Sequence, residues 1–242
     1  MTTFDNAVDL EAVQRGNAST IRPVTFDLYR DIHKAIRSEL FAVATEIARV
    51  DPSDAIAVNA LHTHVQRMIS FLVDHAEHED GVIQPVLVEQ LPALADRVAD
   101  EHETLERRMA GLLDLSTACV ATGNRRFALH QLYLEWSAFI AGYLLHIDLE
   151  ERVIGPAVED AVGVPRVIEM HEAIVGSIPP PDMAAALALM LPAMNLDDRV
   201  EMLGGMRMGA PAEVFSSVWN LTRSVLACDD FDAVSNRLFG PR

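Results

Sequence analysis

The chain has 242 residues, of which 50% are hydrophobic, and its formal net charge at pH 7 is −17. So large a negative charge repels phosphate groups, which excludes nucleic acids and anionic membranes as principal partners and favours cations wherever carboxylates converge. The cysteines, Cys119 and Cys228, are too few for a disulfide framework or a thiolate zinc site, and they indicate a reducing compartment.

The N-terminal segment, residues 1–23, is expected to be an extension, because it is acidic and lacks the apolar stretch of a signal peptide. The most apolar later stretch, residues 183–194, is too short to span a bilayer. These features predict a cytoplasmic protein with no membrane partner.

Four long amphipathic helices are predicted between residues 24 and 158, because apolar residues recur there every three or four positions. Their apolar positions run over residues 26–50, 61–82, 95–112 and 132–153. Asp51-Pro52-Ser53-Asp54 separates the first two helices, and Gly123-Asn124 separates the last two. These short connections predict an all-α fold in which residues 24–160 form an antiparallel four-helix bundle.

Every predicted helix carries a histidine among its apolar positions, namely His33, His75, His102 and His146. A single histidine on an apolar helix face is usually a hydrogen-bonded core residue. Four buried polar groups, however, would each cost about 1–3 kcal/mol unless they find a partner, and one shared partner would satisfy all of them. We therefore expect the four side chains to meet at a common site in the centre of the bundle.

Two segments of similar sequence, HAEHEDGVIQP (residues 75–85) and HIDLEERVIGP (residues 146–156), suggest what this partner is. In each, a glutamate follows the histidine by one helical turn, so Glu79 shares a face with His75 and Glu150 shares one with His146. Imidazoles and carboxylates are ligands for iron, manganese or zinc, and four imidazoles with two or three carboxylates suit two ions. Glu79 and Glu150 would bridge these ions, because they come from different helix hairpins.

This ordered set of residues resembles the hemerythrin family, specifically the bacterial hemerythrin-like HHE cation-binding proteins, over about residues 25–160. The matching residues in chain order are His33, His75, Glu79, His102, His146 and either Glu150 or Glu151. The resemblance implies a non-haem di-iron centre, with two iron ions joined by an oxo or hydroxo bridge and by two carboxylates. Manganese is the alternative that the ligand types alone leave open.

Two positions depart from the oxygen-carrying hemerythrins. Those proteins have a second histidine four residues after the first on the third helix, where this chain has Glu106. We predict Glu106 as a seventh ligand, although it could instead be a solvated surface residue, since Leu105 competes for the apolar position. In the carriers the fourth-helix carboxylate follows its histidine by five residues. Here both Glu150 and Glu151 are acidic, and the repeat with the second helix favours Glu150.

Three further residues could support the predicted ligands. Asp80 and Glu151 stand at matching positions of the two repeated segments and could hydrogen-bond to the ligands, although adjacent acids on a helix surface are common. Tyr143 lies one turn before His146 and could hydrogen-bond to a small molecule at the centre. An aromatic residue at this spacing is, however, more often part of the core.

A carboxylate in place of an imidazole stabilises the oxidised state of a metal and lowers its reduction potential. Reversible oxygen carriage needs the reduced state to be recovered, so the sequence favours a di-iron protein that reacts with or senses O2, peroxide or NO. It could be an enzyme of the peroxidase, catalase or oxidase type, or a sensor. One alternative is reversible O2 binding or iron storage without turnover. Another is repair of iron–sulfur or nitrosative damage, weakened by the absence of the cysteine-bearing N-terminal domain such proteins often carry.

After the bundle, residues 161–181 are predicted to be a linker that contains Gly163, Pro165 and three consecutive prolines at 179–181. Residues 182–242 are predicted to be a helical region, with helices over 182–192, 197–207, 212–226 and 229–238. Because this region has little apolar surface for a core of its own, we expect it to pack on the bundle. Its methionines would alternatively suit a gating surface or a homodimer contact.

Overall fold

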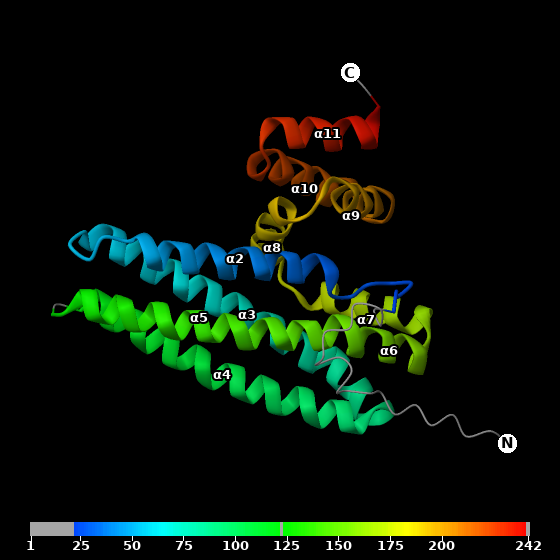
Figure 1. Cartoon of the computed structure of the whole chain (residues 1–242). Helices are drawn as coiled ribbons and strands as arrows, with labels where there is room; N and C mark the ends of the chain where they lie inside the picture. Colours follow the sequence, from blue (N-terminus) through cyan, green and yellow to red (C-terminus); the bar gives the residue numbers. More distant parts are fainter. Residues whose placement is uncertain (1–21, 122, 241–242) are drawn as a thin grey trace.

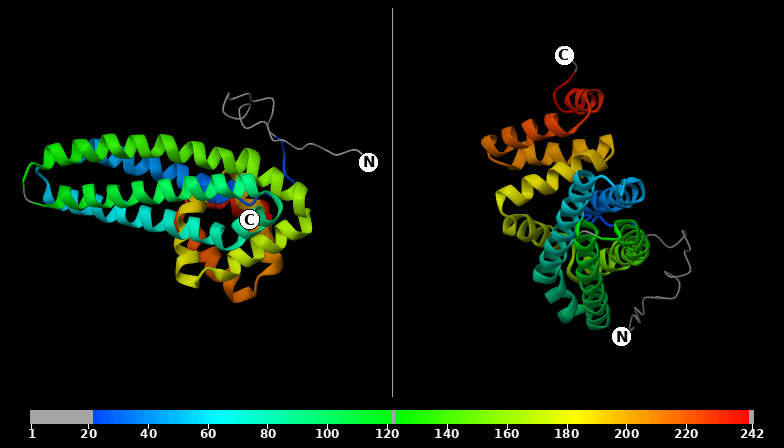
Figure 2. Two further views of the ribbon diagram at one scale, coloured as in Figure 1. Left: turned by 90° about the horizontal axis from the view of Figure 1, so that it is seen from below. Right: turned by 90° about the vertical axis from the view of Figure 1, so that its left-hand side faces the viewer.

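The computed structural model describes residues 22–121 and 123–240, and all regular secondary structure within these ranges is helical (Figure 1). The predicted all-α fold class is therefore confirmed. Four long helices come first: α2 (Arg30–Arg49), α3 (Ala55–Gln90), α4 (Pro92–Val120) and α5 (Arg125–Leu149). They lie side by side, with α3 packed against α2 and α4, and α5 packed against α4 and α2, around a common interior (Figure 2). We call α2–α5 the four-helix unit.

The helices of this unit begin where the sequence predicts. At the start of α3, the side chain of Asp54 accepts hydrogen bonds from the backbone N–H groups of Ile56 and Ala57. At the start of α5, the side chain of Asn124 accepts one from the N–H group of Phe127. The first N–H groups of a helix have no partner within the helix, so these caps stabilise both starting points.

The interior of the four-helix unit contains two apolar clusters with a polar layer between them. The larger cluster includes Ile36, Leu40 and Trp136, and the smaller one includes Tyr29 together with residues from α3, α4 and α7. Along α2, the buried His33 lies between Tyr29 of the smaller cluster and Ile36 of the larger one. The same order of apolar, polar and apolar side chains occurs on α3 and α4, so the polar layer is closed on both sides by apolar packing.

The predicted linker over residues 161–181 is wrong, because most of this segment is helical. The π-helix η2 (Glu150–Ile154) and the helix α6 (Gly155–Val162) follow α5 directly, and α7 (Val164–Ser177) comes after a turn at Gly163. Val167 and Met170 of α7 are buried in the smaller apolar cluster, where they cover the end of the four-helix unit. The prolines at 180–181 do not form an extended linker. They occupy the first turn of the next helix, where proline is well tolerated.

The C-terminal region consists of α8 (Pro180–Ala193), α9 (Leu196–Gly209), α10 (Ala212–Val225) and α11 (Cys228–Phe239), within two residues of the four predicted helices. These helices form a third apolar cluster of their own, which includes Leu191, Leu203 and Val234. The region packs on the four-helix unit through α8 and α2, and Lys34 and Arg30 of α2 form ion pairs with Asp198 of α9 (Figure 1).

Within the described ranges, none of the helices taken singly has the length and apolarity needed to cross a membrane. The consecutive helices α7 and α8 meet that requirement in length and composition only when they are taken together, and they are bent by 114° relative to each other.

Candidate metal centre

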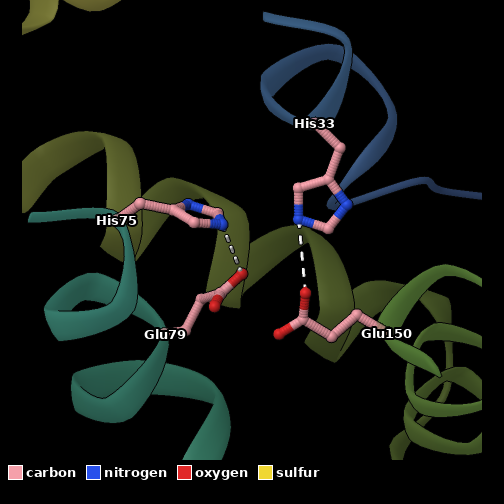
Figure 3. A group of neighbouring side chains, drawn as sticks. All are labelled: His33, His75, Glu79 and Glu150. Atoms are coloured by element: carbon pink, nitrogen blue, oxygen red, sulfur yellow. Dashed lines mark ion pairs between the residues drawn. The ribbon is translucent and has the colours of Figure 1, made fainter. Parts of the chain in front are cut away.

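The polar layer of the four-helix unit contains two overlapping groups of possible metal ligands. The first group is His33, His75, Glu79 and Glu150, and the second is Glu79, His102, His146 and Glu150. Within each group, one nitrogen or oxygen atom from every residue lies within 4.8 Å of the others. Each group therefore has two histidines of its own, and both groups share the carboxylates of Glu79 and Glu150, which come from α3 and η2. Figure 3 shows the first group, with the Glu79 carboxylate near His75 and the Glu150 carboxylate near His33.

The side chains of these groups are almost completely withdrawn from solvent, with His33 exposed by 0% and Glu150 by 2%. Several of their polar atoms nevertheless have no hydrogen-bond partner among the described residues. These atoms are His33 Nε2, His75 Nε2, Glu79 Oε2 and Glu150 Oε2. Buried polar atoms without partners are costly, and four of them at one place indicate that a bound cation completes the site.

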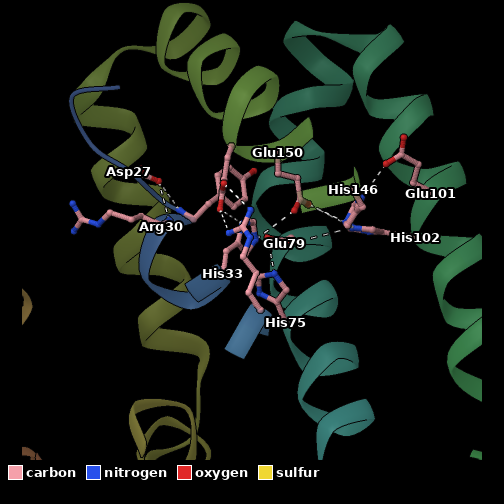
Figure 4. A network of polar contacts seen from close by, with 12 residues as sticks. Asp27, Arg30, His33, His75, Glu79, Glu101, His102, His146 and Glu150 are labelled. Atoms are coloured by element: carbon pink, nitrogen blue, oxygen red, sulfur yellow. Dashed lines mark hydrogen bonds and ion pairs between the residues drawn. The ribbon is translucent and has the colours of Figure 1, made fainter. Parts of the chain in front are cut away.

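The other ring nitrogen of three histidines is held by a carboxylate outside the two groups. His33 Nδ1 lies 3.0 Å from Glu151, His102 Nδ1 lies 2.9 Å from Asp80, and His146 Nδ1 lies 3.0 Å from Glu101. Figure 4 shows Glu101 approaching His146 from the side remote from Glu150. A carboxylate accepts a hydrogen bond from N–H, so it places the proton of each ring on Nδ1 and leaves a lone pair on Nε2 for a metal ion.

Several electron-rich atoms therefore face each other in the centre of the site. His33 Nε2 lies 3.4 Å from a carboxylate oxygen of Glu150, and His102 Nε2 lies 3.1 Å from His146 Nε2. Neither contact is favourable between two lone pairs, whereas a cation between such atoms would attract both. The residues that are present thus fit two cations, one for each pair of histidines.

The negative charge of Glu150 is balanced by positive charge on the neighbouring histidines. Burial by itself disfavours a charged Glu150, but the charge of His146, the closeness of the His102 and His146 rings and the charge of His33 outweigh it and hold its pKa well below the usual range. Burial also lowers the pKa of His146, but the charge of Glu150 and the hydrogen bond to Glu101 outweigh this and raise it to about 9. Without a metal ion, a proton on His146 supplies positive charge, so binding of a cation would release that proton.

The comparison with known proteins agrees with this geometry. Residues 24–158 match the model of a family described as the hemerythrin HHE cation binding domain. The chain belongs to this family. Neither a curated protein nor a solved structure matches the chain. Cation binding is the property for which the family is named, and its metal is typically iron, so the buried histidines and glutamates are the candidate metal ligands of the domain.

Six of the seven predicted ligands come together in this hemerythrin HHE domain. They are His33, His75, Glu79, His102, His146 and Glu150. Glu106 does not join them, because its side chain is exposed and belongs to neither group. The adjacent Leu105 occupies the core-facing position of α4, and successive residues of a helix point about 100° apart. Glu106 instead borders a small cavity that reaches Glu79, His102 and His146.

Glu150 and Glu151 are placed differently by the π-helix η2, which begins at Glu150. Glu150 belongs to both ligand groups, whereas Glu151 lies outside them and forms hydrogen bonds with His33 Nδ1 and with the guanidinium group of Arg37. Burial opposes a charge on Glu151, but His33 and Arg37 outweigh it and lower its pKa to about 2. Single-turn π-helices often occur at functional sites, and here the wider turn presents two consecutive glutamates to the region around His33.

Two buried tyrosines lie beside the ligands. The ring of Tyr29 stacks on His33 with 5.1 Å between centroids, and the ring of Tyr143 makes an edge contact with His146 at 5.8 Å. Burial, together with the charges of Glu79 and Glu150, raises both tyrosine pKa values well above 10, so both phenols keep their protons. The sequence predicts Tyr143 as a supporting residue, whereas Tyr29 was not identified from the sequence.

The carboxylate of Glu101 was not identified from the sequence. It stands directly before a ligand, His102, but it acts on a different one, His146, which belongs to the neighbouring helix α5. Asp80 shows the same arrangement, since it follows Glu79 in the sequence and binds His102 of α4. The repeated segments hinted at Asp80 and Glu151, whereas Glu101 has no counterpart in the repeat, so the sequence carried no signal for it.

Proposed function

We propose that the hemerythrin HHE domain of this chain forms an antiparallel four-helix bundle that holds two iron ions, bridged by Glu79 and Glu150. The observation that carries the proposal is the sharing of both glutamates between two groups that each have their own pair of histidines. A single ion at either pair would leave the other two imidazoles without a partner in a buried site. Nitrogen and oxygen donors also suit manganese, and the family favours iron.

We further propose that this centre reacts with or senses a small oxidant, namely O2, peroxide or NO. A pair of iron ions supplies the electrons that such chemistry needs. The size of the oxidant follows from the surroundings, because the apolar clusters close the site on two sides. The two cavities beside it are small, and Glu79 and His102 are among the residues that line each of them. These cavities favour a molecule of a few atoms over a larger organic substrate.

The residues of the chain would have distinct tasks in this function. The six clustered side chains would bind the ions, while Asp80, Glu101 and Glu151 would hold three of the histidines in the tautomer that leaves Nε2 free. Tyr29 and Tyr143 border the two cavities on different sides, so each could donate a hydrogen bond to a molecule bound there. The low cysteine content and the strongly negative charge favour action in the cytoplasm.

The proposal is tested by metal analysis and by reaction with oxidants. Purified protein, or protein reconstituted with Fe²⁺ without oxygen, should contain about two iron ions per chain. The reduced protein should then be mixed with peroxide, O2 and NO in separate experiments. Catalytic oxygen release or repeated turnover would support an enzyme. An optical spectrum that appears with O2 and disappears on degassing would support reversible binding without turnover.

Protein that takes up no iron under these conditions would contradict the metal centre. Protein that binds two iron ions but shows no spectral change with any of the three oxidants would leave the centre intact and contradict the oxidant chemistry. Iron storage would then be the better interpretation. A variant with Glu79→Ala and Glu150→Ala serves as the metal-free reference, and Glu103→Ala on the exposed surface of α4 serves as its matched control.

A further inference from the structure

The helix α5 carries several large apolar side chains on its outer side as well as on its inner side. Phe127, Leu134 and Leu145 are exposed by 57%, 51% and 74%. In contrast, α4 has no exposed large apolar side chain among its described residues. A helix of a soluble protein usually shows one apolar face toward the core, so a second apolar face indicates a second packing partner.

These side chains form a continuous stripe along α5. We call it the outer stripe, and it consists of the exposed residues Phe127, Gln131, Leu134, Ala138, Ala141 and Leu145. Their spacing alternates between three and four, so they fall within an arc of about 80° around the helix axis and extend over about 27 Å. This is the spacing by which one helix packs along another, as in a coiled coil.

Charge on the surface of the four-helix unit is distributed unevenly around the outer stripe. The exposed acidic residues of α3 and α4 are Asp74, Glu77, Asp80, Glu89, Asp96, Asp100, Glu103, Glu106 and Asp114. Between residues 125 and 149, α5 exposes only one acidic side chain, Glu135. In a chain with a net charge of −17, the outer stripe is thus a surface where a second copy can approach without strong repulsion.

We propose that the outer stripe of α5 is an interface with a second copy of this chain, and that the two α5 helices pair in antiparallel orientation. The stripe is symmetric about residue 136, so an antiparallel partner would place Leu134 opposite Ala138 and Gln131 opposite Ala141. In the middle of the contact Leu134 and Gln131 then each meet an alanine, so the helices can approach closely there, and at both ends Phe127 meets Leu145. A parallel pair would place Ala138 opposite Ala138 and leave space unfilled.

A second copy fits the outer stripe better than an unrelated partner. An antiparallel pair with twofold symmetry is self-complementary, and closed twofold dimers are the commonest assemblies of soluble proteins. The pairing also directs the acidic surfaces of α3 and α4 of both copies away from the contact. A single pair of helices is a small interface, so we expect a dimer that dissociates in the micromolar range.

The experiment is sedimentation velocity on the full chain, over a roughly hundredfold range of concentration that spans the micromolar range. The unchanged protein should pass from monomer to dimer within this range. The variant Leu134→Glu should weaken dimerisation at least tenfold, while Ala110→Glu on the exposed face of α4 should not change it. Because Leu134 and Ala110 are both exposed, circular dichroism should show the same helix content in all three proteins.

The orientation is tested by disulfide formation in a Cys228→Ser background. Chains with Leu134→Cys and chains with Ala138→Cys should form a mixed disulfide faster when combined than either forms alone. A protein that stays monomeric throughout the range would overturn the proposal. So would a dimer that Leu134→Glu leaves intact and Met208→Glu disrupts, which would place the contact on the C-terminal helices, where Met208 is 91% exposed.

Discussion

The Nε2 atoms of His102 and His146 face each other at 3.1 Å in the middle of the polar layer. Each ring donates its Nδ1–H to a different carboxylate, Asp80 for His102 and Glu101 for His146, so the two Nε2 atoms point at one place that a single proton or a metal ion can occupy. Two lone pairs at this distance repel each other unless a proton or a metal ion lies between them. This contact leads directly to predictions about the metal centre and its surroundings.

The first prediction concerns metal removal. Stripping the metal with a chelator should lower the free energy of unfolding, because the cations bind the folded chain and the separated ligands bind them only weakly. At a free metal concentration about 1,000 times the dissociation constant, the loss is about 4 kcal/mol. Thermal melts with and without anaerobic Fe²⁺ measure it. The difference should shrink in His33→Gln, because His33 belongs to one of the two ligand groups, and persist in full in His78→Gln, since His78 belongs to neither.

The second prediction separates Glu150 from Glu151. Glu150 belongs to both ligand groups, so Glu150→Gln should remove at least one of the two metal ions. Glu151 contacts His33 Nδ1 and Arg37, so Glu151→Gln should keep both ions and bind them about 10–100-fold more weakly. Titration with Co²⁺, followed by its visible absorption, gives both the stoichiometry and the affinity. Loss of an ion in Glu151→Gln alone would reverse the assignment.

The third prediction concerns Glu101, which the sequence did not reveal. Glu101→Gln should weaken metal binding about 10–100-fold, because the amide no longer holds His146 in its metal-binding tautomer. The matched control is Glu103→Gln, two residues away on the exposed side of α4, where Glu103 forms an ion pair with Arg107. Equal affinities in the two variants would show that Glu101 does not position His146.

The fourth prediction follows from the exposed position of Glu106. Glu106→Gln should leave the number of bound metal ions and their affinity unchanged, since the side chain lies outside both ligand groups. Its place beside the cavity that reaches His102 and His146 allows a different effect, on the rate at which small molecules or Fe²⁺ enter. Metal content measures the first property and stopped-flow uptake of Co²⁺ the second. A lower metal content in this variant would restore Glu106 as a ligand.

The fifth prediction concerns pH and a contact far from the ligands. His64 of α3 lies between Glu39 and Glu46 of α2, and its Nε2 and Nδ1 atoms are 3.0 Å and 2.6 Å from their carboxylates. The hydrogen bond to Glu39 and the contact with Glu46 raise the pKa of His64 above 6.5 in spite of its burial. The protonated His64 therefore adds to the free energy of unfolding. This contribution is complete below about pH 6.5, the pKa of an unfolded histidine, and is lost as the pH rises through the raised pKa of His64 in the folded protein.

Urea unfolding of the metal-free protein at pH 6 and pH 9 measures this contribution. His64→Gln should lose about 0.5–1 kcal/mol at pH 6 and much less at pH 9, as expected for a partly buried ion pair. His130→Gln, at an exposed position of α5, is the control and should change little at either pH. A loss of equal size at both pH values would show that packing, and not charge, makes His64 important.

The sequence by itself was sufficient for the helices and for six clustered residues. Residues three and four apart share one face of a helix, so His75 must lie on the same face as Glu79, and His146 on the same face as Glu150. The apolar residues around each pair show that this face is directed toward the interior of the protein. The four predicted C-terminal helices were found for the same reason. A linear pattern shows the direction of a side chain relative to its own helix axis, and a core-facing polar residue stands out in it.

The tertiary structure decided which residues of different helices meet. Glu101 binds His146 across the contact between α4 and α5, and Glu151 reaches His33 of α2 from the π-helix η2. The exposure of Glu106 and the helical packing of α7 likewise depend on which neighbours compete for the interior. Such contacts join residues far apart in the chain, and their geometry follows from how whole helices pack, which the period of a single helix does not contain.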